Sequence, residues 1–174
     1  MKLSESGKLF FNAYTLLLDA RSELHQYFTD VIRESKMILQ EYVDEKAPET
    51  PCKLKVHALK NNKSNLSRVA IQITVPSGNH SGVSGDIRVI CFDMRNHEYV
   101  SSTQAPATIE VWSAISNIKI RSALNQLADE TYGEDIFGNY DLLLPMNSSE
   151  EDAKIVADAI TMKCEQLMAL LPLL

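Results

Sequence analysis

The sequence predicts an α+β protein with a largely antiparallel sheet of about five or six strands, flanked by a long N-terminal helix and two C-terminal helices. Apolar residues first recur at helical spacing, then alternate with polar residues through the middle of the chain, and finally return to helical spacing. The chain has 174 residues, which is near the size of one domain. We therefore expect residues 1–174 to form a single domain.

Residues 4–45 are expected to form one long helix that begins at Ser4 as its N-cap and stops before Pro48. Its apolar stripe recurs every seven residues, at Phe10, Leu17, Leu24, Val31 and Ile38. Such a helix would be about 60 Å long, whereas a compact domain of this size is only about 40 Å across. The helix must therefore either break or project from the domain as an interaction element.

The middle of the chain has the alternation of strands. Residues 53–59 (KLKVHAL) and 67–75 (SRVAIQITV) each place apolar side chains on one face only. Residues 86–94 (DIRVICFDM) are apolar on both faces, which is typical of a strand in the middle of a covered sheet. Two shorter strands are expected at 98–103 (EYVSST) and 107–114 (ATIEVWSA).

The last third of the chain is predicted as helix, strand and helix, over 116–131, 139–144 and the C-terminal segment. The terminal segment, SSEEDAKIVADAITMKCEQLMALL, has Ser148 or Ser149 as a candidate N-cap. The acidic residues that follow suit the positive end of the helix dipole.

Cysteine usage and the N-terminus indicate a cytoplasmic protein. Three cysteines lie far apart, with no CxxC pair of the kind that binds zinc. The apolar run at the N-terminus is interrupted by polar residues and is shorter than the ~20 residues of a membrane span. We expect no membrane association, no metal and no cofactor.

Charge is unevenly distributed along the chain. The net charge is −6, yet residues 53–121 hold nine basic and four acidic side chains and residues 122–174 hold two basic and ten. A basic hairpin at 53–68 is a candidate site for nucleic acid or another polyanion. Its anion-binding residues would be Lys53, Lys55, Lys60, Lys63 and Arg68. Alternatively, this hairpin faces the protein's own acidic segment or forms a lysine-guarded sheet edge.

Two polar stretches of the sequence are candidates for chemistry. In CFDMRNHEYV (91–100), the polar residues stand between two apolar runs, which is the pattern of a hairpin turn rather than a catalytic site. The stretch SGNHSGVSGD (77–86) lacks the motifs of nucleotide loops and nucleophile elbows, and we interpret it as a connection between strands. If a small ligand binds anywhere, we expect it in this loop, at Gly78, His80, Ser81 and Ser84.

A metal-dependent nuclease is a further alternative, because Asp86 and Glu110 stand on predicted strands between helices. Such sites usually place a lysine two residues after the second acid. Here Glu110 is followed by Val111 and Trp112, so that lysine is absent. The pattern argues against this chemistry.

The sequence thus favours a binding or protein-interaction module over an enzyme, and we assign no catalytic residue. The expected partner is a second copy, as an antiparallel homodimer joined through residues 10–39, or another protein that docks on the same stripe. Polyanion binding by the 53–68 hairpin is the first alternative. A metal-dependent hydrolase or nuclease-like enzyme is the second.

Overall fold

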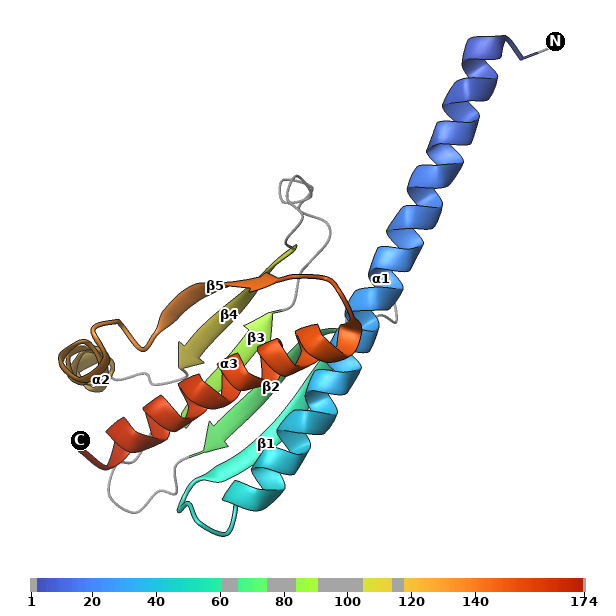
Figure 1. Ribbon diagram of the computed structural model, residues 1–174. Helices are drawn as coiled ribbons and strands as arrows, with labels where there is room; N and C mark the ends of the chain where they lie inside the picture. The colour runs from blue at the N-terminus through green and yellow to red at the C-terminus, as the bar shows by residue number, and fades with distance from the viewer. Residues whose placement is uncertain (1–2, 61–65, 75–83, 91–104, 114–117, 174) are drawn as a thin grey trace.

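The computed structural model describes residues 3–60, 66–74, 84–90, 105–113 and 118–173 (Figure 1). It confirms the α+β class. Five strands and three α-helices follow one another as α1 (Glu5–Lys46), β1 (Lys53–Lys60), β2 (Leu66–Thr74), β3 (Ser84–Ile90), β4 (Ala105–Ser113), α2 (Ile118–Tyr132), β5 (Gly138–Leu144) and α3 (Ser149–Leu170). A short 3-10 turn, Leu171–Leu173, ends the described chain.

Helix α1 is a single helix of 42 residues. Ser4 caps it as predicted, because its side-chain oxygen accepts a hydrogen bond from the Gly7 amide at 3.2 Å. The helix ends where the amide of Ala47 donates to the carbonyl of Val43, immediately before Pro48. Of the two outcomes expected for a helix of this length, the structure has the continuous one, and its N-terminal half projects from the rest of the molecule (Figure 1).

The strands pair in the order β1-β2-β3-β4-β5, and each pair is antiparallel. The register places Val56, Ile71, Ile87 and Val111 side by side across four strands. Residues 91–94 of the predicted third strand and the predicted strand 98–103 lie outside the described residues. Along β1 and β2, apolar side chains alternate with polar or small ones, so one face of these strands is apolar and packs against the helices.

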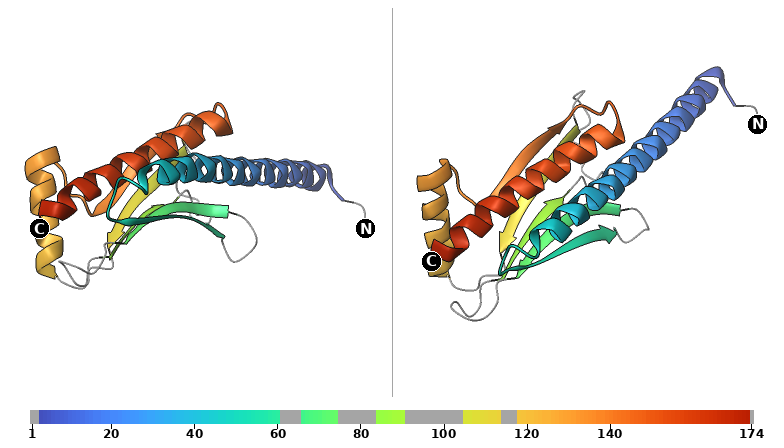
Figure 2. Two further views of the ribbon diagram at one scale, coloured as in Figure 1. Left: turned by 90° about the horizontal axis from the view of Figure 1, so that it is seen from below. Right: turned by 60° about the horizontal axis from the view of Figure 1, so that its bottom comes forward.

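One face of the sheet is covered by α3 and by the C-terminal half of α1, which run side by side over it (Figure 2). The core between these layers includes Ile32, Leu39, Ile71 and Ile160, all fully buried. The two helices approach closely at Ser35, whose hydroxyl donates to the carbonyls of Val31 and of Ala153 on α3. Small side chains at this crossing allow the two backbones to pack directly.

Helix α2 lies beside the C-terminal end of α3 and buries Leu124 and Ala128 (Figure 2). It ends at Gly133, which has a φ of 73°, a conformation that glycine adopts without steric cost. In the segment that follows, Glu134 accepts a hydrogen bond at 2.5 Å from the ammonium group of the buried Lys163 on α3. That ammonium also lies 3.9 Å from the centre of the Tyr140 ring on β5.

The N-cap of α3 is Ser148, which is one of the two predicted candidates. Its side chain accepts a hydrogen bond from the Glu151 amide at 3.1 Å. The acidic residues predicted to suit the helix dipole occupy the first turn of α3. Both caps, at the start of α1 and of α3, were therefore visible in the sequence.

Candidate interaction surface

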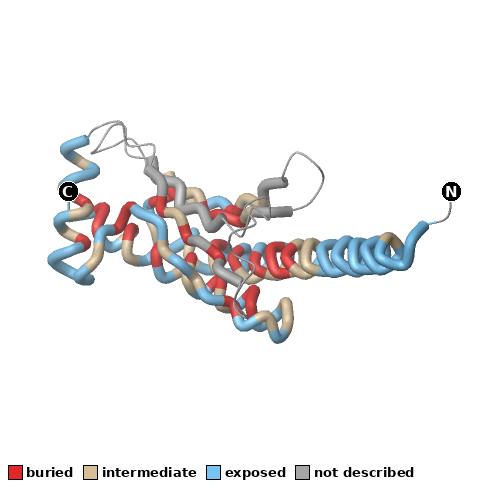
Figure 3. Tube along the Cα trace, turned by 90° about the horizontal axis from the view of Figure 1, so that it is seen from above, coloured by how far each residue is buried: buried red, intermediate tan, exposed pale blue. Residues whose placement is uncertain are grey.

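The projecting part of α1 is the largest exposed apolar feature among the described residues. Every residue from Leu3 to Glu23 is exposed except Gly7, which is half-buried; we call this segment the N-terminal arm (Figure 3). Its large apolar side chains are exposed to between 45% and 73%: Leu3, Leu9, Phe10, Phe11, Tyr14, Leu16, Leu17 and Leu18. A soluble monomer rarely leaves so many large apolar residues together in water.

The arm exposes enough apolar surface for a specific interface. An aromatic side chain carries about 150–250 Å² of surface, and burial of a leucine corresponds to roughly 100 Å² at 25 cal/mol/Å². With more than half of each side chain exposed in most cases, the arm presents on the order of 800 Å². The largest apolar patch on a typical monomer is only about 300–600 Å², whereas a stable interface buries about 800 Å² per partner.

The arm is helical because it continues a helix that is already formed and packed. An isolated helix gains little stability in water without tertiary packing, since its first turn is costly to nucleate. Here the docked half of α1 supplies that nucleus, and Ser4 caps the far end. Within the arm, the rings of Phe10 and Tyr14 stack with their centroids 6.3 Å apart. No proline interrupts the segment between these points.

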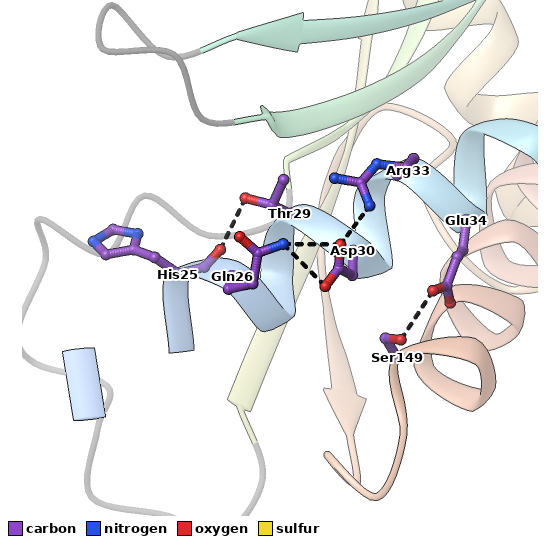
Figure 4. Close-up of polar contacts among 7 residues, drawn as sticks. All are labelled: His25, Gln26, Thr29, Asp30, Arg33, Glu34 and Ser149. Carbon is purple, nitrogen blue, oxygen red and sulfur yellow. Dashed lines mark hydrogen bonds and ion pairs between the residues drawn. The ribbon is translucent and has the colours of Figure 1, made fainter. Parts of the chain in front are cut away.

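Polar contacts lie at residues 25–34 of α1, just after the arm; we call this stretch the root of the arm and the rest of the described molecule the body (Figure 4). On the solvent side of the helix, Asp30 accepts from Gln26 at 3.1 Å and pairs with Arg33 at 2.6 Å. Toward α3, the hydroxyl of Ser149 donates to Glu34 at 3.0 Å. These contacts join the root of the arm both to its own helix and to the start of α3.

Tyr27 provides a second connection at the root. Its hydroxyl donates to Oδ2 of the fully buried Asp152 at 2.7 Å, and the same oxygen accepts from the Met146 amide at 3.1 Å. Burial and this hydrogen bond raise the pKa of Tyr27 above its usual value. The direction in which the arm leaves the body is therefore set by packing together with a buried hydrogen bond.

The structure divides the predicted stripe into two parts. Phe10 and Leu17 are exposed on the arm, at 73% and 68%. By contrast, Val31 is fully buried, and Leu24 and Ile38 pack half-buried against the core. These three contact the chain's own body, because the C-terminal half of α1 lies on the sheet. They are thus unavailable to a partner while α1 stays docked, and the expected interface through residues 10–39 has to be shortened to the arm.

Sequence reasoning omitted Leu9 and Leu16, which are each 70% exposed. They lie beside the seven-residue stripe on the helix and not within it. The signal that could have found them is the width of the apolar face, which exceeds the narrow seam implied by a seven-residue recurrence.

Part of the predicted basic hairpin is described. Lys53 and Lys55 are exposed on β1, and Arg68 on β2 is half-buried. Between Lys55 and Arg68, the His57 ring lies within hydrogen-bonding distance of Gln72, at 3.0 Å. Alternation places Lys53, Lys55 and His57 on the sheet face opposite α1 and α3. The side chain of Lys60 and the whole of Lys63 lie outside the described residues.

The other sequence candidates are mostly outside the described part of the chain. This holds for Gly78, His80 and Ser81 of the ligand loop and for the stretch 91–100, whereas Ser84 begins β3.

The two acids of the nuclease alternative lie on neighbouring strands. In the register of β3 and β4, Asp86 is opposite Trp112 and Glu110 is opposite Arg88. Among the described residues, no group of three or more His, Cys, Asp or Glu side chains is placed to hold a metal ion.

In the described ranges, no helix is both long enough and apolar enough to cross a membrane. Among the described residues, the arrangement offers a projecting helix with exposed apolar side chains and an exposed pair of lysines. Searches of protein-family models, of curated proteins and of solved structures found no match to this chain.

Proposed function

We propose that this protein works by binding rather than catalysis, and that its N-terminal arm associates with the arm of a second copy. The observation that carries the proposal is the exposed apolar surface of the arm, on the order of 800 Å². Burial of each leucine or phenylalanine contributes roughly 1.5–3 kcal/mol. An arm left in water would therefore be an unfavourable equilibrium state.

The charges of the arm favour an antiparallel second copy as the partner. The arm holds Glu5, Lys8, Asp19, Arg21 and Glu23, so it is nearly neutral although the whole chain carries −6. Full antiparallel overlap places Arg21 of one arm at the axial level of Glu5 of the other. A parallel pair would place Arg21 beside Arg21, which is repulsive. Antiparallel packing also opposes the two helix dipoles and keeps the two bodies at opposite ends.

A membrane surface fits the arm less well. Helices that lie on anionic bilayers carry lysine and arginine along the polar face. The polar face of this arm is lined by Lys8, Asn12, Thr15 and Asp19, with one charge of each sign. Electrostatic attraction to anionic lipid is therefore weak.

The test is the mass in solution of wild-type protein and of two matched variants, by light scattering or sedimentation at micromolar protein. Leu17→Asp places a carboxylate on the apolar face, whereas Thr15→Asp places the same group on the polar face. Each copy with Leu17→Asp loses about 1.5–3 kcal/mol of burial, so we expect the dissociation constant to rise roughly 10²-fold or more. Thr15→Asp should associate like the wild type.

Far-UV circular dichroism and the melting temperature of the dilute protein show whether each variant stays folded. A wild-type protein that is monomeric at high micromolar concentration contradicts the proposal. Equal association of Leu17→Asp and the wild type contradicts it too.

A second candidate function is binding of a polyanion by the exposed face of β1. It is favoured by the exposure of Lys53 and Lys55, which alternation along β1 places on the sheet face opposite α1 and α3. Binding of this kind weakens steeply with salt. A gel-shift titration with DNA and RNA at low salt tests it, with the double variant Lys53→Glu and Lys55→Glu expected to lose binding. Absence of any shift by the wild type would remove this candidate.

A further inference from the structure

The apolar face of the arm is wider than a single partner helix covers. With about 100° between successive residues, its apolar side chains span an arc of about 220° around the helix axis. One edge of this arc is formed by Leu9 and Leu16, and the other by Phe11 and Leu18. Phe10 and Leu17 lie near its centre. The remaining arc holds polar residues, Lys8, Asn12, Thr15, Asp19 and Ser22 among them, whereas Arg21 falls within the apolar arc.

The docked half of the same helix shows how much of its circumference the sheet and α3 cover together. Its buried residues, together with the apolar residues that pack half-buried against the core, span an arc of about 160°. They are Leu24, Tyr27, Phe28, Val31, Ile32, Ser35, Ile38, Leu39, Tyr42 and Val43. The apolar arc of the arm is thus wider by about 60°, and the excess lies at both edges.

A two-helix pair would therefore leave one or both edges in water. If the partner helix packs on Phe10 and Leu17, then Leu9 and Leu16 face solvent on one side and Phe11 on the other. In a four-helix bundle, each helix instead contacts two neighbours, so a wider part of its circumference is covered than in a pair. That arrangement matches the arm.

Resting on the self-association proposed above, we infer that four arms from four copies form an antiparallel four-helix bundle. The arm is 21 residues long, from Leu3 to Glu23, which corresponds to about 31 Å of helix. In an up-down-up-down arrangement, both neighbours of every arm are antiparallel to it. Arg21 then meets the axial level of Glu5 on both neighbours, and two bodies stand at each end. The symmetry is that of a dimer of dimers.

A three-arm bundle has a specific cost. Three helices in a ring cannot all be antiparallel to their neighbours, so at least one pair is parallel. In that pair Arg21, which falls within the apolar arc, meets the same residue at the same level. Four is therefore the smallest number that both covers the arc and opposes the charges.

The mass distribution of three proteins tests the inference, measured by sedimentation equilibrium over a range of concentrations. The wild type should approach four times the 19.5 kDa of one chain. Leu16→Asp alters an edge and spares the centre, so we expect a species of twice the single-chain mass. Leu17→Asp alters the centre and should be monomeric. Circular dichroism of each variant controls for loss of fold. No arm residue belongs to the described core, so substitutions in the arm should not unfold the rest of the molecule.

The outcomes separate this inference from the proposed function. A wild type that stops at the dimer overturns the bundle and leaves self-association standing. A monomeric wild type overturns both. A tetramer that persists unchanged in Leu16→Asp overturns the assignment of the arm's edges to a second neighbour. A tetramer that becomes a dimer in Leu16→Asp supports the bundle.

Discussion

The hydrogen bond between Tyr27 and Asp152 allows a specific prediction, because one donor oxygen and one acceptor oxygen define it. Tyr27→Phe removes only the hydroxyl that donates to Asp152 Oδ2 at 2.7 Å. The ring is kept, so no large cavity forms. Asp152 is fully buried, and its Oδ1 has no hydrogen-bond partner in the described part of the chain. After the change, the Met146 amide still donates to this carboxyl at 3.1 Å.

The expected loss follows from the charge on the acceptor. A hydrogen bond to a charged group contributes about 1.5–3 kcal/mol to the free energy of unfolding. A loss of about 2 kcal/mol lowers the melting temperature of a protein of this size by about 4–8 °C. Tyr132→Phe is a matched control, since Tyr132 is exposed at the end of α2. We expect that control to change stability by less than about 0.5 kcal/mol.

Alkaline pH gives a second readout of the same contact. The pKa of Tyr27 is raised in the folded state, first by burial and then by Asp152, whereas an unfolded tyrosine titrates near 10. Below that pH both states hold the proton and the contribution is complete. Above it the unfolded chain releases its proton first, so stability falls as pH rises. Tyr27→Phe should make this alkaline decline shallower.

A double-mutant cycle with Asp152→Asn decides whether the two residues act through each other. Asparagine keeps the shape and removes the charge, so Tyr27→Phe should cost less in that background. Urea unfolding of all four proteins at one protein concentration measures the coupling, since association itself changes apparent stability. Effects that add within about 0.3–0.5 kcal/mol would refute the reasoning.

Three further predictions concern the body. Leu39→Ala removes a fully buried side chain and should cost about 2–5 kcal/mol in urea unfolding, against less than about 0.5 for the exposed Met37→Ala. Glu134→Ala leaves the buried ammonium of Lys163 without its carboxylate, so it should destabilise more than Lys163→Met, which removes the buried charge itself; the reverse order in thermal melts would contradict this. Burial raises the pKa of the Cys164 thiol to about 12, so peptide mapping after alkylation at pH 8 should find it unmodified until the protein unfolds.

The fold class and most element ends were predictable because they depend on local chemistry. Ser4 was predicted as a cap, and Ser148 was one of two candidates, from hydroxyl side chains before apolar periodic runs; each accepts an amide hydrogen bond. The alternation in β1 and β2 predicted which side chains enter the core. Val69, Ile71 and Ile73 are all fully buried.

The division of α1 was not predictable from periodicity. A seven-residue recurrence identifies an apolar face of a helix, but it does not show where along the helix the sheet and α3 stop covering that face. Phe10 and Val31 occupy equivalent positions in the pattern, yet one is exposed and the other is buried in the core. The difference arises from the length of the strands and of α3 beneath the helix, which is a tertiary property.

Two buried polar residues could not be predicted from the helical pattern for a similar reason. Ser35 lies at the close crossing of α1 and α3, where its hydroxyl donates to the backbone carbonyls of Val31 and Ala153. Lys163 is a lysine in the middle of α3, and it is buried because Glu134 and the ring of Tyr140 surround its ammonium. Both partners come from distant or non-helical segments that a helical pattern does not contain.

The continuity of α1 has an energetic consequence for association through the arm. A segment that became helical only upon binding would have to be ordered at that moment, at about 1–2 kcal/mol per residue for the backbone. Here the docked half of α1 and the contacts of Tyr27 hold the helix before any partner arrives. The apolar side chains are thus presented on a formed helix, and more of the free energy of their burial remains for affinity. For this reason the strength of association should depend on the root of the arm as well as on the apolar residues along it.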